Sequence, residues 1–555
     1  MPVLVARKAS FCMGVRRALD AVLEARRRYT GVIYTYGPLI HNPQVLEVLA
    51  RNNIRPLEPG AAPGSPVVIR AHGITPEERK ELKERGFVLV DATCPRVAQV
   101  QALAKRAAGQ GKTVVILGDR DHAEVKGILG FCRSKGFVIE KESDLSMLDH
   151  VEEGVLLFQT TLNREYADRM TESIRRKVPA IIVQDTLCEA TDQRQAEARS
   201  LAHQCDAVIV VGGKSSANTA RLVQVIEEEK CAAIHVETEE DLPGDVKRYA
   251  NIGITAGAST PYWLVHRVEE KVREIQLSEW MKPIWMIFSF LVRSYLLNGL
   301  GAFGIAWAMG KLLGMGTGTF PLLAALYIFG IHVVNGYGLE HSMEINEPMQ
   351  KIFLARYRKV LLPAAFLATL TLLILASQFS HLLLFLTSLA VLLGALYPLP
   401  IPFLPFKLKD LPASKDLFTS AAWAFFSVLL PAWMTHTLTL DSWIATLCIF
   451  SLLFSRALLY DIKDLQGDRM LGRETIPVIL GRRGGQIFSI GMILVGTILI
   501  FFLPAPCLIL LVLPCHALLV HYLYHAGFIT GGVRFSLVVD GLLPFLPLLL
   551  TFQAM

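Results

Sequence analysis

The chain has 555 residues, 52% of them hydrophobic, and a mean hydropathy of +0.41. This is too apolar for a wholly soluble protein, and the excess follows residue ~280, where long hydrophobic runs alternate with short basic loops. The formal net charge of +6 is small. Its basic residues in the C-terminal half lie mostly in alternate loops, which indicates membrane topology and argues against nucleic acid as a partner.

We therefore expect a soluble domain over 1–278 and an integral-membrane domain over 279–555. The first residues, MPVLVARKASFCMGV, lack the long apolar core of a signal peptide, so the soluble domain is expected to stay in the cytoplasm. Nine cysteines without close-spaced pairs favour free thiols or metal ligands in a reducing compartment over a disulfide scaffold.

The soluble part alternates short β-rich runs with amphipathic helical stretches, which predicts an α/β domain with parallel sheets. Polar and small residues follow the runs, at the strand ends where such folds place ligands. The expected strands lie in 67–73, 87–94, 113–119, 155–162, 180–188, 207–213 and 251–257.

Cys12, Cys94 and Cys188 each precede a helical stretch, at near-regular intervals. This predicts three similar α/β lobes that each offer one thiolate to a common centre. Three thiolates suit an iron–sulfur cluster with one iron free for substrate, and the alternative is three buried core cysteines. The remaining cysteines are expected in the core: Cys132, Cys205, Cys231, Cys448, Cys507 and Cys515.

Polar motifs lie between the cysteines. They carry His41 (GPLIHNPQV), His72 (RAHGITP), His122 and Glu124 (GDRDHAEVKGILG), Thr160 (QTTLN), Ser216 and Asn218 (VGGKSSANT) and Ser259 (TAGASTP). Together with the cysteines, and in this order, these motifs resemble the family of 4-hydroxy-3-methylbut-2-enyl diphosphate reductases over residues 1 to about 275.

The resemblance implies a pseudo-threefold, three-lobed fold around a [4Fe-4S] cluster held by Cys12, Cys94 and Cys188. It also implies reduction of the substrate to isopentenyl and dimethylallyl diphosphate, in the methylerythritol phosphate pathway of isoprenoid biosynthesis, with a ferredoxin or flavodoxin as electron donor. Substrate contacts are expected from His41, His72, His122, Thr160, Ser216, Asn218 and Ser259.

The chemistry of these side chains agrees with that expectation. Histidine, hydroxyl and amide donors can hold a diphosphate by charge-assisted hydrogen bonds. Glu124, His122 and Thr160 are the expected catalytic residues. Glu124, beside His122, is expected to donate the proton with which the hydroxyl leaves as water. The family usually has two adjacent serines before the asparagine, whereas the second position here is Ala217, which removes one hydroxyl from the diphosphate site.

About nine apolar segments are long enough to span a bilayer. They lie near 283–307, 319–338, 360–378, 381–400, 416–435, 441–460, 485–503, 506–525 and 534–553. Basic residues fall in every second loop, namely Lys351, Arg356, Arg358 and Lys359, then Lys407, Lys409 and Lys415, then Arg469, Arg473, Arg482 and Arg483. This pattern predicts a multi-pass protein of the inner membrane with its N-terminus in the cytoplasm.

Asp461, Asp464 and Asp468 follow an apolar helix at i, i+3 and i+7, so they share one helical face. Three carboxylates on one face need cations, and Mg²⁺ with water and substrate phosphates is the natural partner. At the end of a membrane helix this indicates a diphosphate whose hydrocarbon tail lies in the bilayer. The alternative is a solvated cytoplasmic loop.

Nine helices and DxxDxxxD followed by GRETIPV resemble the UbiA family of Mg²⁺-dependent intramembrane prenyltransferases. That family has a second motif, NDxxDxxxD, often leading to INEP, and here the stretch is NGYGLEHSMEINEP. The expected aspartates fall on Leu339 and Met343, and the acids Glu340 and Glu344 are displaced by one residue, a rotation of about 100° on a helix.

Either a helix irregularity turns Glu340 and Glu344 toward a metal ion, or that half of the metal site is lost. Lys415, Asp416 and Arg456 are weaker candidates for contacts with the diphosphate or the acceptor.

Three functions are consistent with the sequence. The chain is a bifunctional reductase and prenyltransferase, or a reductase anchored by a non-catalytic prenyltransferase-like domain, or an iron–sulfur sensor or scaffold without turnover. The diphosphate-binding residues argue against the sensor. The aspartates of the second half favour the bifunctional enzyme, whereas Leu339 and Met343 favour the anchored reductase.

Overall fold

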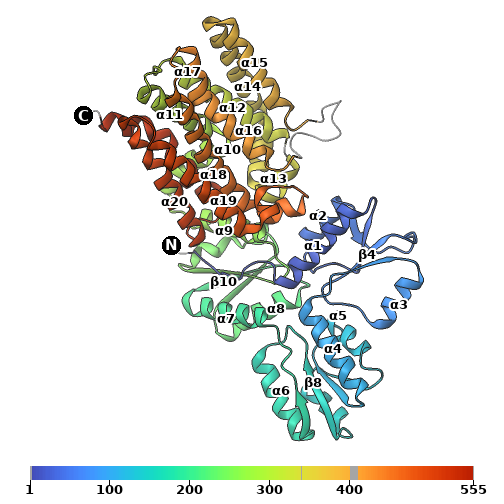
Figure 1. Ribbon diagram of the computed structural model, residues 1–555. Coiled ribbons are helices and arrows are strands. Elements are labelled where there is room, and N and C mark those ends of the chain that lie inside the picture. The colour runs from blue at the N-terminus through green and yellow to red at the C-terminus, as the bar shows by residue number, and fades with distance from the viewer. Residues whose placement is uncertain (1–2, 339, 400–410, 554–555) are drawn as a thin grey trace. The chain divides into compact units, whose positions relative to one another are not determined.

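The computed structural model describes residues 3–338, 340–399 and 411–553, except for the side chains of residues 340–342 and 552–553. The chain divides into two compact units, Met1–Gln276 and Leu277–Met555 (Figure 1). Each unit has its own core and is described by itself.

The N-terminal unit contains three parallel sheets of four strands each, labelled β4, β8 and β10 in Figure 1. In spatial order the first sheet is β3 (Ile54–Pro56), β2 (Ile33–Tyr36), β4 (Pro66–Ile69) and β5 (Val88–Asp91). The second is β7 (Gly136–Ile139), β6 (Thr113–Leu117), β8 (Glu153–Phe158) and β9 (Ala180–Val183). The third is β11 (Ala232–Val236), β10 (Ala207–Val211), β12 (Ile252–Ala256) and β1 (Val3–Val5).

The three sheets repeat one strand order. In each, the first strand of the lobe lies between the second and third, and the fourth lies at the edge. In the third sheet the fourth position is taken by β1, which pairs in parallel with β12, so that Val3 lies opposite Ile252. The N-terminal strand therefore completes the last lobe, and the expected three-lobed α/β architecture is present.

All seven expected strands are present in the sheets. The sequence prediction missed β1, β2, β3, β7 and β11. Of these, all except β2 are edge strands, and β1 and β3 have three residues each. Short edge strands carry too little apolar alternation to be distinguished from loops.

Helices cover the sheets of the N-terminal unit. They are α1 (Met13–Arg28), α2 (Pro43–Arg51), α3 (Pro76–Glu84), α4 (Pro95–Gly109), α5 (Ala123–Gly130), α6 (Arg164–Lys177), α7 (Glu189–Gln204), α8 (Ala217–Glu228) and α9 (Tyr262–Ile275). Three of them connect lobes. Helix α1 leaves the third sheet and packs on the first, α4 leaves the first and packs on the second, and α7 leaves the second and packs on the third.

The C-terminal unit is helical. Its helices are α10 (Met281–Arg293), α11 (Leu296–Leu312), α12 (Thr319–Gly338), α13 (Glu340–Asn346), α14 (Pro348–Phe379), α15 (His381–Leu396), α16 (Ser414–Ala424), α17 (Leu430–Met434), α18 (Leu440–Met470), α19 (Ile476–Ile500), α20 (Val512–His525), α21 (Gly532–Asp540) and α22 (Leu546–Gln553). Bulky apolar side chains such as Phe366 and Ile487, 71% and 73% exposed, point outward as they would toward lipid.

Every expected span coincides with a helical segment of this unit. Seven segments are long and apolar enough to cross a membrane, and the pair α10 and α11, bent by 73°, makes an eighth if it is one span. The expected span at 381–400 corresponds to the 16-residue α15, which is shorter than the others. The described chain thus supports seven or eight spans, and the expected count of nine is not confirmed.

A buried arginine ties two segments of the N-terminal unit together. Arg194 of α7 is 5% exposed and donates hydrogen bonds to the carbonyl oxygens of Ser10 and Ala256, each at 2.8 Å, and to that of Lys8. These bonds fix the segment between β1 and α1 against the end of β12. A buried guanidinium satisfied by carbonyls is costly to remove, because each carbonyl would be left without a donor.

We expect Arg194→Ala to loosen the segment that leads into α1. Amide hydrogen exchange of peptides covering residues 6–12 should become roughly tenfold faster or more, because local opening exposes them. Hydrogen exchange followed by mass spectrometry of the full chain measures this. Arg199→Ala, on the same helix but paired with the surface acids Glu165 and Glu229, is the control and should leave the segment unchanged. Equal exchange in wild type and Arg194→Ala would contradict the prediction.

Candidate functional site

The predicted site residues of the N-terminal unit occupy repeated positions in the three lobes. The first strand of each lobe is followed by predicted site residues. These are His41 after β2, His122 and Glu124 after β6, and Ser216 and Asn218 after β10. Third strands lead to His72 after β4, to Thr160 after β8 and to Ser259 after β12. Fourth strands lead to Cys94 after β5, Cys188 after β9 and Cys12 after β1. Because the carboxyl ends of parallel strands lie at one edge of a sheet, each lobe gathers its polar groups there.

The three cysteines are anchored in the same way. Each is the residue before a helix, at the start of α1, α4 or α7. Each backbone N–H donates to a carbonyl in the loop after the adjacent third strand. The bonds are Cys12 to Ala258 at 3.0 Å, Cys94 to Ala71 at 2.9 Å and Cys188 to Thr160 at 2.9 Å. The accepting residue either precedes a predicted substrate contact, Ser259 or His72, or is one, Thr160.

Two of the thiols lie over a glycine. A β-carbon at Gly14 would lie 2.8 Å from Cys94 Sγ and 3.8 Å from Cys12 Sγ, so the absence of a side chain there leaves room for both sulfur atoms. All three cysteines are partly exposed. Burial raises the pKa of the Cys94 thiol, and the neighbouring thiols of Cys12 and Cys188 raise it further. A cationic partner would relieve this repulsion between thiolates.

These cysteines fit an iron–sulfur cluster better than a single metal ion. Within the described residues, no three His, Cys, Asp or Glu side chains converge closely enough for one ion. A cluster does not need such convergence, because each cysteine ligates a different iron. Thiolate ligands at helix N-termini are also stabilised by the helix dipole. Of the other cysteines expected in the core, Cys132, Cys448 and Cys507 are buried, Cys205 and Cys231 are partly exposed, and Cys515 is exposed.

Three histidines lie in a row. The ring centroids of His41 and His72 are 5.5 Å apart, and those of His72 and His122 are 5.3 Å apart. Burial lowers the pKa of all three rings, and the positive charge of Arg70 lowers it further. The effect is largest at the central ring, where it brings the pKa of His72 to about 3. The row is therefore neutral at pH 7 and able to donate from ring N–H groups without carrying charge.

Glu124 and Thr160 form a closed pair. The Thr160 N–H donates to Glu124 Oε1 at 2.7 Å, and the Thr160 hydroxyl donates to Glu124 Oε2 at 3.0 Å. The Glu124 N–H donates to His122 Nδ1 at 3.2 Å, which places the proton of a neutral His122 on Nε2. The Cys188 N–H donates to the Thr160 carbonyl. Thr160 therefore links the Glu124 carboxyl group to the backbone of Cys188.

The carboxyl group of Glu124 retains its proton near neutral pH. Glu124 is 1% exposed, and burial raises its pKa to about 7, although the two hydrogen bonds from Thr160 act in the opposite direction. A carboxyl group with such a pKa can give up a proton at physiological pH, as a general acid must.

The third lobe contributes hydroxyl and amide groups. Ser216 is buried and its hydroxyl accepts from the Thr219 N–H at 3.4 Å, which caps α8. Asn218 lies in the first turn of α8 and is partly exposed. Ser259 is buried and its hydroxyl donates to the His41 carbonyl at 3.2 Å, so the first and third lobes meet at this point. Ala217, the departure from the expected serine, is exposed.

In the C-terminal unit, the predicted acidic motif lies on one continuous helix, α18, and each aspartate has a partner. Lys415 donates to Asp461 Oδ1 at 2.7 Å. Lys463, 4% exposed, pairs with Asp464 at 3.1 Å and with Glu347. Asn346 donates to Asp468 Oδ1 at 2.9 Å, and Arg473 Nη1 lies 3.9 Å from the same atom.

The contact between Asn346 and Asp468 depends on Gly467. A β-carbon on Gly467 would lie 1.7 Å from Asn346 Oδ1, so any side chain there would displace the Asn346 amide from this position. Asn346 and Glu347 belong to the INEP segment of the second motif. This segment is the part of that motif that contacts the acidic motif of α18.

Glu344, one of the two displaced acids of the second motif, pairs with a lysine and not with a residue of the acidic motif. Glu344 lies 3.3 Å from Lys351, and Met343 packs against the apolar cluster around Val333 and Leu354. Leu339 and the side chain of Glu340 lie outside the described residues. A metal-binding role for Glu340 and Glu344 therefore stays a prediction.

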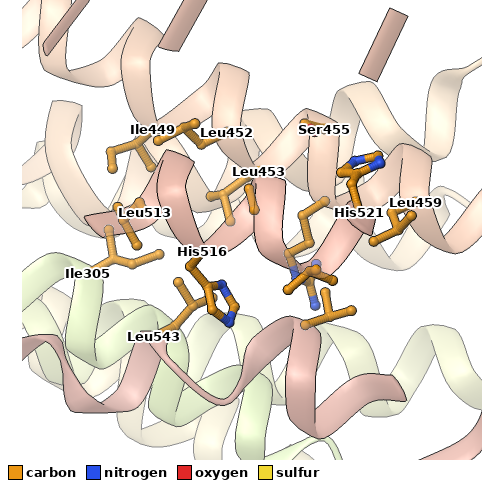
Figure 2. A pocket seen from close by; sticks show the side chains of 14 residues that line it. Ile305, Ile449, Leu452, Leu453, Ser455, Leu459, Leu513, His516, His521 and Leu543 are labelled. Carbon is orange, nitrogen blue, oxygen red and sulfur yellow. The ribbon is translucent and has the colours of Figure 1, made fainter. Parts of the chain in front are cut away.

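An apolar cavity lies beside the same helix. It is lined by residues of α11, α18, α20 and α21 and by Leu543, and the lining includes Ile305, Leu452 and Leu513 (Figure 2). Arg456 also lines it, but its guanidinium is bound to the Asp540 carboxylate, at 2.8 Å between Nη2 and Oδ2. Apart from this paired charge, most of the lining side chains are apolar.

Comparisons with known proteins agree with this division. The LytB protein family model matches residues 3–273, and the UbiA prenyltransferase family model matches residues 355–534. A 4-hydroxy-3-methylbut-2-enyl diphosphate reductase of Solidesulfovibrio magneticus is 42% identical over 281 residues, which are 49% of this chain and 98% of the relative. The chain belongs to the LytB family.

Solved structures resemble the two halves separately. A structure of (E)-4-hydroxy-3-methyl-but-2-enyl diphosphate reductase is 37% identical and covers 49% of this chain and 100% of its own, with a TM-score of 0.41. A UbiA homolog from Archaeoglobus fulgidus is 12% identical and covers 48% of this chain and 98% of its own, with a TM-score of 0.37. We call residues 3–276 the LytB half and residues 277–553 the UbiA half.

Several residues at these sites were not foreseen from the sequence. In the LytB half they include Arg70, which affects all three histidines, and Gln159, whose side chain accepts from the Asp119 N–H at 2.9 Å. In the UbiA half they are Asn346, Glu347 and Lys463. A lysine next to an aspartate on a helix gave no sign that it would be buried, and its ion pairs with Glu347 and Asp464 stabilise it there.

The raised pKa of Glu124 predicts a pH-dependent stability. Between the ordinary pKa of 4.5 and about 7, the folded protein keeps a proton that the unfolded chain releases. The free energy of unfolding should therefore fall as the pH rises through this window, by roughly 3 kcal/mol from this group. Glu124→Gln removes this contribution and should gain stability relative to wild type as the pH rises.

Pulse proteolysis of the LytB half within the full chain, in urea, measures this at pH values on either side of the window. Glu153→Gln, at the exposed start of β8, is the matched control and should follow wild type. Parallel curves for wild type and Glu124→Gln would refute the assignment.

Proposed function

We propose that the LytB half reduces 4-hydroxy-3-methylbut-2-enyl diphosphate to isopentenyl and dimethylallyl diphosphate. The observation that carries the proposal is the Glu124–Thr160 pair, which lies next to His122 and is joined to Cys188 by the Thr160 carbonyl. It combines a protonated carboxyl group, a diphosphate-binding histidine and a cysteine of the proposed cluster. The sequence identity to named reductases supports it.

In this proposal Cys12, Cys94 and Cys188 hold a [4Fe-4S] cluster, which supplies electrons and a Lewis-acidic iron when bound. The diphosphate is held by side chains from all three lobes, namely His41, His72, His122, Thr160, Ser216, Asn218 and Ser259. Neutral histidines donate N–H groups to the phosphate oxygens, and their lowered pKa values rise once the anion is present, since an opposite charge favours the protonated ring.

Glu124 provides the proton for the leaving group. The allylic C–O bond breaks, the hydroxyl takes a proton from Glu124 and departs as water, and two electrons and a further proton complete the reduced product. Thr160 holds the carboxyl group in place through its N–H and hydroxyl. A ferredoxin or flavodoxin is the proposed electron donor.

For the UbiA half we propose binding of a prenyl diphosphate, with the hydrocarbon tail in the apolar cavity and the diphosphate near Asp461, Asp464 and Asp468. The cavity and Asp461 share helix α18, with Arg456 and Leu459 within two turns of Asp461. Transfer of the prenyl group to an acceptor would make the chain bifunctional. The alternating basic loops support a multi-pass protein of the inner membrane with the LytB half in the cytoplasm.

A second candidate function for the UbiA half is anchoring of the reductase without catalysis. It is favoured by the ion pairs at the acidic motif and by Met343, which packs among apolar side chains where the family pattern has an aspartate. The two alternatives differ in whether a prenyl group is transferred, not in the location of the reductase.

Glu124→Gln tests the reductase. The variant should keep the visible absorption of the cluster and lose at least about a hundredfold in turnover, because general acid catalysis contributes that much or more. Anaerobic assay with a chemical reductant and the allylic alcohol substrate measures it, with Glu153→Gln as control. Turnover equal to that of wild type would remove Glu124 from this role.

Ala217→Ser tests the diphosphate site by restoring the serine that this chain lacks. One added hydrogen bond to a charged phosphate should lower KM roughly tenfold while kcat stays similar. Ala220→Ser, exposed on the same helix, is the control and should change neither constant. If Ala217→Ser leaves KM unchanged, the start of α8 does not contact the diphosphate.

A further inference from the structure

The buried guanidinium of Arg194 has no anionic partner. Its hydrogen-bond acceptors among the described residues are three main-chain carbonyls, and no carboxylate there forms an ion pair with it. By contrast, Arg267 and Arg273 of the same half are less buried and pair with Glu239 and Glu269. A carbonyl offers only a partial negative charge, so a buried unit charge bound to carbonyls alone calls for a nearby anion.

The position of Arg194 relates it to two of the proposed cluster ligands. Ser10, whose carbonyl accepts from Arg194 Nη2 at 2.8 Å, is two residues before Cys12. Arg194 itself belongs to α7, the helix that begins directly after Cys188. Side chains on a helix lean toward its N-terminus, which for α7 is the end that carries this cysteine. The positive charge is therefore held against the Cys12 segment by a side chain of the Cys188 helix.

The electrostatics of Arg194 agree with this position. Burial lowers its pKa, whereas negative charge on Cys12, Glu197 and Cys188 raises it, and Arg16 lowers it. Glu197 is partly exposed and Arg16 is exposed, so water screens both of these charges. Two of the three groups that favour the buried charge are thus proposed cluster ligands.

We propose that Arg194 is the counter-charge of the cluster held by Cys12, Cys94 and Cys188 and raises its reduction potential. This inference rests on the proposed function of the LytB half, because it requires that cluster. Reduction moves one electron from the ferredoxin or flavodoxin to the cluster, with no exchange of atoms. It adds one negative charge to the cysteine-bound group, and a fixed positive charge nearby favours that state. Arg194 is a positioning residue, which acts through the cysteines.

Charge and hydrogen bonding at Arg194 can be separated by two substitutions. Arg194→Gln removes the charge but keeps an amide that can donate two hydrogen bonds, whereas Arg194→Lys keeps the charge on an ammonium group with three donors. Both variants lose the planar fork and should loosen the segment 6–12, which hydrogen exchange measures. A difference in potential between them then reports the charge.

The test uses full-length protein, purified anaerobically in detergent, whose cluster content is measured from iron and visible absorption. A redox titration followed by electron paramagnetic resonance gives the reduction potential. Arg194→Gln should lower the equilibrium constant for reduction roughly tenfold, or about 59 mV for a one-electron couple. Arg194→Lys should stay within about threefold of wild type, because the charge remains.

Arg16→Gln is the matched control. Arg16 is exposed and its Nε donates to the Phe11 carbonyl at 3.1 Å, so this substitution removes a screened charge from the same segment. Its shift should be less than about threefold at physiological ionic strength, and should shrink further in high salt. The shift of Arg194→Gln should be the same at low and high salt, since a buried charge is little screened.

Four outcomes decide the matter. Equal potentials for Arg194→Gln and Arg194→Lys, or an equal shift for Arg16→Gln, would overturn the proposal, while turnover by wild type would still support the reductase. If wild type takes up no cluster, this inference and the proposed function fail together. Loss of the cluster from Arg194→Gln alone supports the counter-charge, because both variants lack the fork. Loss from both variants makes Arg194 a structural residue only and refutes it.

Discussion

The arrangement of the LytB half depends on one hydrogen bond made three times. Each cysteine at the head of a connecting helix donates its backbone N–H to the loop after the neighbouring strand, at Ala258, Ala71 or Thr160. That loop also carries a residue proposed to contact substrate. A sulfur atom and a substrate-binding group therefore move together in each lobe, and the geometry between them is set by the backbone, which is stiffer than side-chain contacts.

In the UbiA half the corresponding constraint is charge compensation away from water. Asp461 and Asp468 of α18 are buried and Asp464 is partly buried, and a buried carboxylate is tolerated only with a partner. A hydrogen bond from Asn346 of α13 and an ion pair from Lys415 of α16 join these helices to α18, in addition to apolar packing. The close contact between Asn346 and Gly467 lets the Asn346 amide reach Asp468, because Gly467 has no side chain.

Much of this could be predicted from the sequence because the signals are local. A strand followed by a polar residue, or a cysteine before a helix, is visible within about ten residues, and these signals gave seven strands, the three cysteine positions and the order of the site residues. The missing strand β1 is recognised only through its pairing with β12, a strand far along the chain. The compensation of Asp461 by Lys415 and of Asp464 by Lys463 could not be foreseen either, because it depends on which helix faces pack together.

The position of β1 has a consequence for how the protein is made. This strand is synthesised first, yet its partner β12 ends at residue 256, immediately before the last helix of the LytB half. The third lobe therefore cannot close on the ribosome until almost the whole half has emerged, and Cys12 reaches its final place only then. The first apolar helix begins at Met281, so it leaves the exit tunnel soon afterwards. Closure of the last lobe and delivery of the nascent chain to the membrane are thus nearly simultaneous. Slow translation after residue 256 would give the lobe time to close before the chain reaches the membrane.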